Sequence, residues 1–270
     1  MEQKSKILYL CQQVDPYVAE SSRAVLSREL MQGVHEQGYE IRTFMPRYGV
    51  INERRNQLHE VIRLSGMNII IGDTDHQLII KVATIPSARL QIYFIDNDDY
   101  FSRKALLRDD NGEEFEDNDE RAIFFARGVL ETVKKLRWEP AIVHAHGWFS
   151  ALVAAYLRHS FAEDPIFAEV KIVVSLDDDT FENRLDAELA EKLRSEGIDS
   201  EMIEKMVDPT YENFVRFVLS YADGVVISAD SVSDEVLQIA RECGKPLLEY
   251  QKPSAENYFE NYAKFYDGLL

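Results

Sequence analysis

Short, uninterrupted apolar runs recur along this chain and limit its fold more than any other feature. A strand buried on both faces of a parallel sheet has such a sequence, whereas a half-exposed strand alternates apolar and polar residues. Longer segments with helical spacing separate the runs. This order predicts an α/β fold with a Rossmann-like, doubly wound, mostly parallel sheet that carries helices on both faces. The predicted parallel strands are KILYLC (6–11), EIRTFMP (40–46), AIVHAH (141–146), KIVVSL (171–176), GVVISA (224–229) and PLLEY (246–250).

The segment from residue 58 to residue 95 has a different pattern. Its apolar residues alternate with polar ones, and turn residues such as Gly72, Asp73 and Pro86 divide it. Alternation with a period of two is typical of half-exposed strands. We therefore expect an antiparallel excursion near residues 58–95.

Start and stop signals define the expected helices. Ser21 or Ser22 can cap a first helix, which Gly38 would end. After an acidic, turn-rich loop at 109–120, Asp117 or Asn118 can cap a long helix that runs to residue 136. Further helices are expected at 149–161, 184–220, 232–242 and 255–269.

The final segment, PSAENYFENYAKFYDGLL, predicts a closing helix at 255–269 with Ser254 as its cap. Aromatic residues at helical spacing usually face the core, although an exposed aromatic face could stack on sugar rings or contact a partner. No internal repeat and no linker marks a boundary, so we expect one domain over residues 1–270, complete rather than truncated. The apolar face of the helix comprises Tyr258, Phe259, Tyr262, Phe265, Tyr266 and Leu269.

The charge balance excludes two classes of partner. Thirty Lys and Arg side chains against 48 Asp and Glu give a net charge of −18, and both nucleic acid and anionic membranes need a basic surface. The start of the chain lacks the apolar region of a signal peptide, and no stretch approaches the length of a membrane span, so we expect a cytoplasmic protein. Cys11 and Cys243 are expected to be small buried hydrophobes, and no cofactor is expected.

Ligands of an open parallel sheet bind beyond the carboxyl ends of its strands. The relevant ends here are the loop after Cys11, the segment HAHGW (144–148) and the segment SLDDDT (175–180). His144 and His146 would lie on one face of a strand, where two ligands without a third make a weak metal site. A structural role for both histidines is favoured.

Four segments of the sequence, given at the end of this paragraph, together resemble in order and spacing the amino-terminal domain of bacterial glycogen and starch synthases. The resemblance extends over most of residues 4–231. It implies one half of a two-domain GT-B glycosyltransferase from a family that transfers glucose from ADP-glucose to an α-1,4-glucan with retention of configuration. The segments are FMPRYGVI (44–51), YFIDNDDYFSR (93–103), FEDNDERAIFFARGVLETVKKLRWEPAIVHAHGWFSALVAAYL (115–157) and YADGVVISADS (221–231).

The donor-binding loop departs from the family pattern. The family carries lysine, threonine, two glycines and leucine, where glycines allow close backbone approach and the lysine offsets phosphate charge. The aligned residues here are Ala19, Glu20, Ser21, Ser22 and Arg23. Loss of the charge-assisted hydrogen bond from the lysine to phosphate costs roughly 1.5 to 3 kcal/mol. Glu20 also adds a negative charge where the diphosphate of the donor would lie. We expect weak donor binding at best.

Two further family positions are changed. Gly147 replaces the aspartate that the resemblance places in the active cleft, and Asp177 replaces a histidine that touches the transferred sugar. Asp177 can still accept hydrogen bonds from sugar hydroxyls. Asp177 and Asp179 also have the spacing with which metal-dependent GT-A glycosyltransferases hold an ion, but helix capping in a solvated acidic loop is the favoured alternative.

The resemblance also implies a set of glucan-contact positions near the cleft. A charged surface loop would explain most of these residues equally well, and Glu120 and Arg121 could simply pair with neighbours. Arg103 and Glu120 belong to the same exposed loops. The glucan-binding candidates are Arg47, Tyr48, Asp96, Asn97, Tyr100, Asn118, Arg121, His144, His146 and Trp148.

The family's second Rossmann-like domain, which carries most of the nucleotide pocket, is not part of this sequence. The favoured hypothesis is therefore a pseudoenzyme that binds an α-glucan or maltooligosaccharide, or a regulatory protein with a protein partner or a homodimeric state. The alternative is an active half-enzyme that a partner chain completes. A third hypothesis is an unrelated doubly wound module whose aspartates bind a divalent ion.

Overall fold

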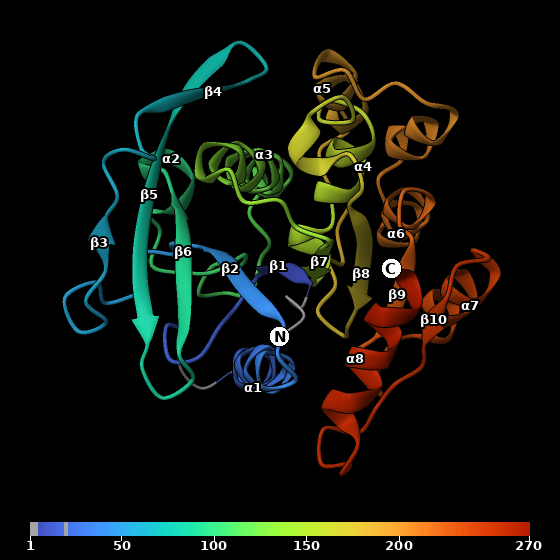
Figure 1. Cartoon of the computed structure of the whole chain (residues 1–270). Helices are drawn as coiled ribbons and strands as arrows, with labels where there is room; N and C mark the ends of the chain where they lie inside the picture. The colour runs from blue at the N-terminus through green and yellow to red at the C-terminus, as the bar shows by residue number, and fades with distance from the viewer. Residues whose placement is uncertain (1–4, 19–20) are drawn as a thin grey trace.

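The computed structural model describes residues 5–18 and 21–270, and a twisted sheet forms its centre (Figure 1). Most of the strands are parallel. The strands are β1 (Lys6–Cys11), β2 (Glu40–Pro46), β3 (His59–Glu60), β4 (Met67–Ile71), β5 (Thr74–Ile85), β6 (Leu90–Asp96), β7 (Ile142–His146), β8 (Lys171–Leu176), β9 (Gly224–Ile227) and β10 (Leu247–Leu248).

The order of the strands confirms the predicted doubly wound topology. Within the described residues it is β10-β9-β8-β7-β1-β2-β6-β5-β3, and β4 pairs with β5. Strands β10 to β6 in this order are parallel, whereas β5 is antiparallel to β6, β3 and β4. The chain leaves β1 for β2 on one side and later returns to β7 on the other side. The ends of β1 and β7 therefore mark the switch point at which such sheets bind ligands.

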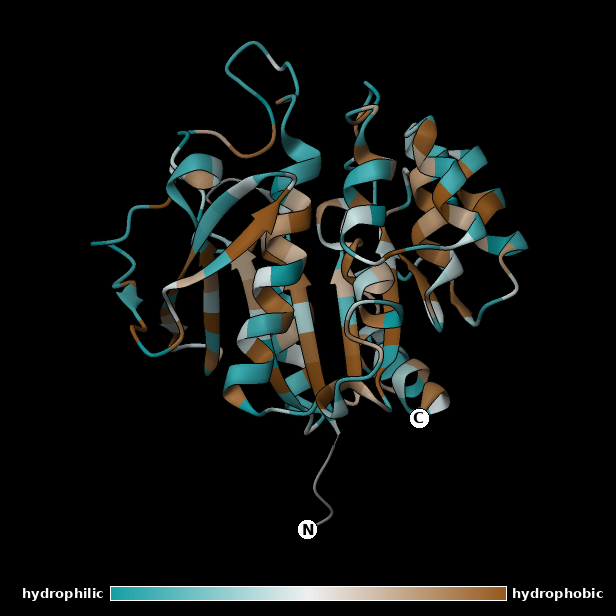
Figure 2. Cartoon of the chain, turned by 90° about the horizontal axis from the view of Figure 1, so that it is seen from above, coloured by the Kyte–Doolittle hydropathy of each residue, from teal (hydrophilic) through white to brown (hydrophobic). Residues whose placement is uncertain are grey.

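Helices cover both faces of the sheet. Figure 1 shows α3 and α4 on one side of it and α1 and α8 together on the other, and α1 contacts α8 while α3 contacts α4. In Figure 2 the strands are largely apolar and the outer helix faces largely polar. The helices are α1 (Ser22–Glu36), α2 (Asp98–Phe101), α3 (Asn118–Leu136), α4 (Val153–Arg158), α5 (Leu189–Ser195), α6 (Tyr211–Ser220), α7 (Asp234–Glu242) and α8 (Tyr258–Leu269), with 3₁₀ helices η1 (Trp148–Ser150), η2 (Pro165–Phe167) and η3 (Glu201–Val207).

Several expected helix boundaries are corrected. The segment 184–220 forms α5, η3 and α6 rather than one helix. Gly197 has a φ of 84° after α5, and Pro209 precedes α6, where a proline disfavours helical backbone before it. Ser254 does not cap α8, because the cap position is Asn257, which makes no side-chain capping bond. The helix predicted at 149–161 is η1 followed by the shorter α4.

Of the caps predicted for α1 and α3, only the cap of α1 makes its side-chain hydrogen bond. Ser21 caps α1 as expected, with its Oγ accepting from the backbone N of Ala24 at 3.2 Å. Asp117 holds the cap position of α3 but makes no capping bond. Its carboxylate instead accepts two hydrogen bonds from Arg103. The loop before α3 is therefore fixed by an ion pair rather than by a cap.

The aromatic face of α8 packs into the core, as predicted. Tyr262 and Tyr266 are almost fully buried. The Tyr266 hydroxyl lies 2.7 Å from the Tyr9 hydroxyl in β1 and 2.8 Å from Nδ1 of His144 in β7. Nε2 of His144 lies 2.5 Å from Ser175 Oγ in β8. A buried chain of hydrogen bonds thus joins three central strands to the C-terminal helix.

The described residues contain no helix that combines the length and apolar character needed to cross a membrane. Cys11 is buried, as expected, whereas Cys243 is only partly buried.

Replacing Gly49 with alanine is expected to lower the free energy of unfolding by about 1–3 kcal/mol. An added Cβ would overlap the carbonyl oxygens of Ser102 and Arg103, and backbone atoms cannot rotate away as a side chain can. The Gly49 N–H already donates to Arg103 O at 3.0 Å, which holds the two loops together. Urea unfolding measures the effect. The control is Gly268→Ala in α8, where the new methyl group has open space and alanine should stabilise the helix; equal losses in both variants would contradict the prediction.

Candidate functional site

A cavity of about 430 Å³ lies at the carboxyl ends of the central strands. Its walls come from the first turns of α1, the ends of β7, β8 and β9, and the segment that precedes α8. This is the switch-point edge of the sheet, where the sequence places its candidate site. The lining residues are Ser22, Arg23, Val25, Leu26, Glu29, His146, Asp177, Asp178, Ser228, Ala229, Asp230, Ser231, Tyr250 and Pro253.

The end of β7 contributes His146 and the glycine after it. His146 is 7% exposed, and burial lowers its pKa to about 4, so the ring is neutral near pH 7. Its Nε2 has no hydrogen-bond partner among the described residues. Gly147 has a φ of 85° and a ψ of 158°, a backbone conformation that is essentially restricted to glycine. An added Cβ there would lie 3.3 Å from Gln12 Oε1 and 3.4 Å from Asp177 Oδ2.

Three consecutive aspartates follow β8. Asp177 Oδ1 accepts from the backbone N of Asp179 at 2.9 Å. Burial and the neighbouring Asp179 carboxylate raise the pKa of Asp177 to about 7. The Asp179 carboxylate accepts from Nε2 of Gln12, the first residue after β1. This acidic loop is therefore held against the end of β1, which lies beyond β7 in the sheet.

The aligned donor loop is only partly described, because Ala19 and Glu20 lie outside the described residues. Ser22 and Arg23 begin α1 and line the cavity. The Arg23 guanidinium donates to Asp178 Oδ1 from Nε at 3.0 Å and from Nη2 at 2.8 Å.

Arg23 is the one cation among the described residues that line the cavity. Its ion pair with Asp178 compensates that charge. The remaining lining carboxyl groups leave the cavity acidic. They belong to Glu29, Asp177 and Asp230.

The aspartates do not form a metal centre of their own. Across residues 5–18 and 21–270, no three His, Cys, Asp or Glu side chains are grouped so that they could hold a metal ion. Asp177 and Asp179 would therefore need ligands from outside these residues, since structural and catalytic sites use three or more protein ligands or added water.

Most of the predicted glucan-contact residues lie elsewhere. The sequence predicted that the loop residues among them are exposed. This prediction is wrong for the loop residues whose side chains are 5% exposed or less. Of the candidates, His146 lines the cavity and the others do not. The buried residues are Tyr48, Asp96, Asn97, Tyr100, Asn118, Arg121 and Trp148; His144, which the sequence places on a strand in a structural role, is buried as well.

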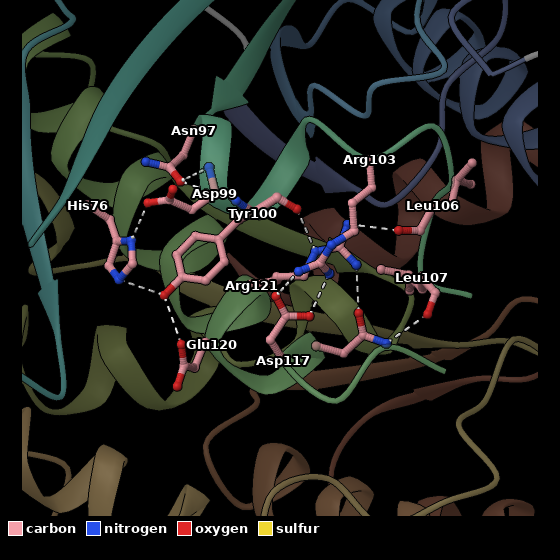
Figure 3. Close-up of polar contacts among 11 residues, drawn as sticks. His76, Asn97, Asp99, Tyr100, Arg103, Leu106, Leu107, Asp117, Glu120 and Arg121 are labelled. Carbon is pink, nitrogen blue, oxygen red and sulfur yellow. Dashed lines mark hydrogen bonds and ion pairs between the residues drawn. The ribbon is translucent and has the colours of Figure 1, made fainter. Parts of the chain in front are cut away.

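Figure 3 shows how part of this set stabilises the loop between β6 and α3. The Tyr100 hydroxyl donates to Glu120 Oε2 at 2.9 Å and lies 2.9 Å from Nε2 of His76. Asn97 caps α2, with its Oδ1 accepting from the backbone N of Asp99 at 3.0 Å and of Tyr100 at 3.2 Å. These contacts form a structural cluster that connects β5, α2 and α3.

Arg121 is fully buried at the centre of that cluster. Its guanidinium donates to Tyr100 O at 2.9 Å, Leu106 O at 2.8 Å and Asn118 Oδ1 at 2.7 Å. No carboxylate pairs with it among the described residues. Aromatic rings surround the charge, with the centroids of Phe101 and Phe115 each 5.4 Å away. Arg121 thus satisfies backbone carbonyls of the loop that it supports.

Arg47 and Trp148 also have structural partners. Arg47 Nη2 and Lys81 Nζ each lie 2.9 Å from a carboxylate oxygen of the buried Asp96. The Trp148 ring packs edge-on against Phe181, with ring centroids 5.0 Å apart.

Sequence reasoning missed several cavity residues. Gln12 follows β1, and Ser228 follows β9, so the rule that ligands bind beyond strand ends could have identified both. Asp230 and Ser231 lie in the same loop after β9. Tyr250 carries no such signal, because its place beside α1 depends on how the segment after β10 folds back.

Replacing Asp177 with asparagine is expected to stabilise the protein at pH 8 by about 1–2 kcal/mol, after allowance for water in the open cavity. The folded-state pKa of about 7 lies above the ordinary value of 3.8. The folded protein therefore retains a proton that the unfolded chain has lost, and wild-type stability falls as the pH rises from about 4 to about 7. Urea unfolding of both proteins at pH 5 and pH 8 measures the difference, which should be smaller at pH 5, where only part of the loss has occurred. A stability difference independent of pH would contradict this assignment.

Comparison with known proteins identifies the family. Residues 6–248 match the family model of the starch synthase catalytic domain. The glycogen synthase of Chlorobium limicola is 37% identical over 196 residues, which cover 72% of this chain and 40% of that protein. The glycogen synthase of Chlorobaculum parvum is 33% identical over 241 residues, which cover 86% of this chain and 47% of the relative. The chain thus spans less than half the length of these curated relatives.

A solved structure supports the fold. The catalytic domain of starch synthase IV from Arabidopsis thaliana, bound to ADP and acarbose, superposes with a TM-score of 0.71. The match covers 92% of this chain and 52% of that one, at 14% sequence identity. These findings confirm the resemblance and exclude an unrelated doubly wound module. This chain belongs to the glycogen and starch synthase family.

Proposed function

We propose that this chain is a glucan-binding or regulatory member of its family that does not itself transfer glucose. The proposal rests on the negative charge of the cavity at the strand ends. Its lining contains four carboxyl groups, and its one described cation, Arg23, already pairs with Asp178.

An acidic cavity is a poor site for a sugar nucleotide. The diphosphate of ADP-glucose carries negative charge, and a phosphate site needs free cationic groups or close backbone N–H groups. Arg23 would have to leave Asp178 to contact a phosphate, and the side chain of Ser21 already accepts from the backbone N of Ala24. The ion pair of Arg23 and the capping bond of Ser21 therefore both oppose binding of the sugar nucleotide at this end of the fold.

A neutral saccharide avoids that repulsion. Carboxylate and serine oxygens accept hydrogen bonds from sugar hydroxyls, and a tyrosine ring can pack against a sugar ring. Asp230 and Tyr250 present such groups to the cavity, and Ser231, whose hydroxyl donates to Asp178 Oδ2 at 2.7 Å, can still accept through its oxygen. Its volume of about 430 Å³ lies within the range of small-molecule sites. We therefore propose the end of an α-glucan or maltooligosaccharide as the ligand.

Parallel calorimetric titrations with maltohexaose and ADP-glucose test the proposal. We expect maltohexaose to bind and ADP-glucose to give no measurable heat, together with retention on a glycogen affinity column and no glucosyl transfer. Binding of ADP-glucose in this experiment would contradict the proposal.

Two variants sharpen the test. Tyr250→Ala should weaken maltohexaose binding about tenfold, since a lost stacking contact is worth roughly 1 kcal/mol or more. Asp178→Asn should release Arg23 and raise the affinity for inorganic pyrophosphate, because it removes the carboxylate that pairs with the cation. An unchanged pyrophosphate affinity would mean that this ion pair does not limit anion binding.

A half-enzyme completed by a partner chain is the second candidate. It is favoured by the names of the curated relatives, which are glycogen synthases. The test adds a separately expressed polypeptide that resembles the remaining part of those relatives and measures glucose transfer from ADP-glucose to glycogen. Transfer that requires both chains would establish this candidate over the first.

A further inference from the structure

The cavity beside Gly147 holds hydrogen-bond acceptors that lack donors. Within the described residues, no group donates to Asp177 Oδ2, and the Asp230 carboxylate has neither a hydrogen bond nor an ion pair. Glu29 approaches a cation only at 4.0 Å, in Arg28. Glu29 and Asp230 are exposed, so water can solvate their carboxylates, whereas Asp177 is only partly exposed and its charge is less well solvated.

Two buried polar side chains point independently to a ligand at the same place. His146 is 7% exposed and lines the main cavity, and its Nε2 has no partner within the described part of the chain. Gln12 is 6% exposed, and its Oε1 is likewise unpartnered. Gln12, His146, Asp177 and Asp179 line a small neighbouring pocket of about 10 Å³, together with Gln13, Arg23 and Ser27. Buried polar atoms of this kind are rare without a water or ligand that satisfies them.

Gln12 Oε1 and Asp177 Oδ2 both lie close to Gly147. The position that a Cβ of residue 147 would take lies 3.3 Å from Gln12 Oε1 and 3.4 Å from Asp177 Oδ2. Because glycine has no Cβ, the space between the two oxygens stays open. The pocket that Gln12 and Asp177 line has a volume of about 10 Å³, which leaves room for one group of about the size of a water molecule.

Part of the cavity wall is apolar. This surface comes from Val25 and Leu26 of α1 and from Tyr250 and Pro253. Val25 is 36% exposed. This wall can cover the carbon skeleton of a ligand whose polar end faces Asp177.

We propose that this cavity binds a small organic cation, in which a primary ammonium group lies beside Gly147 and a carbon or sugar skeleton packs against Val25 and Tyr250. An ammonium group has three donors and no acceptor, which matches the unpaired oxygens of Gln12 and Asp177 and the neutral ring of His146. An amino sugar and an aliphatic amine share this chemistry. The inference goes beyond the proposed function, because it names a second ligand class for the same cavity.

Matched ligands isolate the ammonium group. Calorimetric titrations compare 6-amino-6-deoxyglucose with glucose and 1,4-diaminobutane with 1,4-butanediol, so that each pair differs only in amine for hydroxyl. At pH 8 we expect at least tenfold tighter binding of the amine in one or both pairs. A preference confined to the amino sugar identifies a saccharide ligand, and a preference in both pairs identifies the amine alone as sufficient. Equal affinities within both pairs would overturn the inference.

The preference should also depend on pH. The groups that face Asp177 are Arg23 from α1, His146 from β7, Tyr211 from α6, and Asp178 and Asp179 from its own loop. Burial raises the pKa of Tyr211 and lowers that of His146 to about 4, so neither titrates between pH 6 and pH 8. Asp177, with a pKa of about 7, gains its charge in this interval. The amine preference should therefore fall several-fold from pH 8 to pH 6.

Variants separate this site from general charge effects. Asp177→Asn should abolish the amine preference at pH 8. Glu191→Gln removes the same charge from an exposed residue of α5 that does not line the cavity, and should leave the preference unchanged. Equal losses in the two variants would overturn the assignment of the ammonium to Asp177.

Failure of this inference is distinguishable from failure of the proposed function. Maltohexaose binding without an amine preference would retain the proposed function and reject the cation site. Amine binding without maltohexaose binding would support the cation site and reject the glucan ligand.

Discussion

Replacing Arg121 with methionine is expected to lower the free energy of unfolding by about 3–5 kcal/mol. Methionine approximates the length of the side chain but cannot donate. It would leave the carbonyl oxygens of Tyr100 and Leu106 and the Oδ1 of Asn118 without their buried donor. Each unsatisfied buried acceptor costs roughly 1–3 kcal/mol. Urea unfolding followed by circular dichroism measures the loss.

The matched control is Arg103→Met in the same loop. Arg103 is about one-third exposed and pairs with a half-buried carboxylate of Asp117, so its loss should cost at most about 1 kcal/mol. If Arg121→Met cost no more than this control, the backbone carbonyls of the loop would not depend on Arg121. In that case a role for Arg121 in ligand binding would regain support.

Replacing Gly147 with aspartate, which restores the family residue, is expected to destabilise the protein by about 3–5 kcal/mol at pH 8. The backbone conformation with a φ of 85° is strained for any residue with a Cβ. The new side chain would also start 3.4 Å from Asp177 Oδ2 and add a second negative charge beside it. The loss should be smaller at pH 5, where Asp177 is protonated.

A second substitution tests this coupling. In the Gly147→Asp background, Asp177→His should recover about 1–3 kcal/mol of the loss, because it removes the like charge. Urea unfolding of the two single variants and the double variant gives the interaction energy. Strictly additive losses would show that backbone strain alone excludes aspartate at position 147.

The sequence predicted the central strands well because burial on both faces leaves a plain signature. The predicted strands at 6–11, 40–46 and 171–176 coincide with β1, β2 and β8. Strands β1 and β8 are buried except at their first residue, whereas only the last four residues of β2 are buried. The alternating burial of β5 likewise follows from one face packed on the core and one exposed.

The interior position of Arg121 could not be predicted. Its partners include the carbonyl oxygens of Tyr100 and Leu106, and every residue type carries a carbonyl, so no sequence pattern marks it as an acceptor. Tyr48 and Asn118 likewise belong to polar loop segments that are typical of exposed surface, yet both are buried. Tertiary packing decides burial at such positions.

The candidate cavity was predicted in part. The rule for parallel sheets correctly indicated the ends of β1, β7 and β8. It could not indicate that Gln12 and Asp177, from different strand ends, converge on Gly147, since that depends on the register of strands distant in sequence. Nor could it indicate that Asp178 engages Arg23.

The hydrogen bond between Tyr9 and Tyr266 has a consequence for synthesis of the protein. Strand β1 leaves the ribosome early, but its hydroxyl partner lies 257 residues later, in the helix that covers that face in Figure 1. At 5–20 residues per second, roughly 13–50 seconds would separate the emergence of the two tyrosines. During that interval Tyr9 would lack its partner, as would His144 from the time it emerges, and a chaperone that shields apolar strands would have its longest opportunity to bind there.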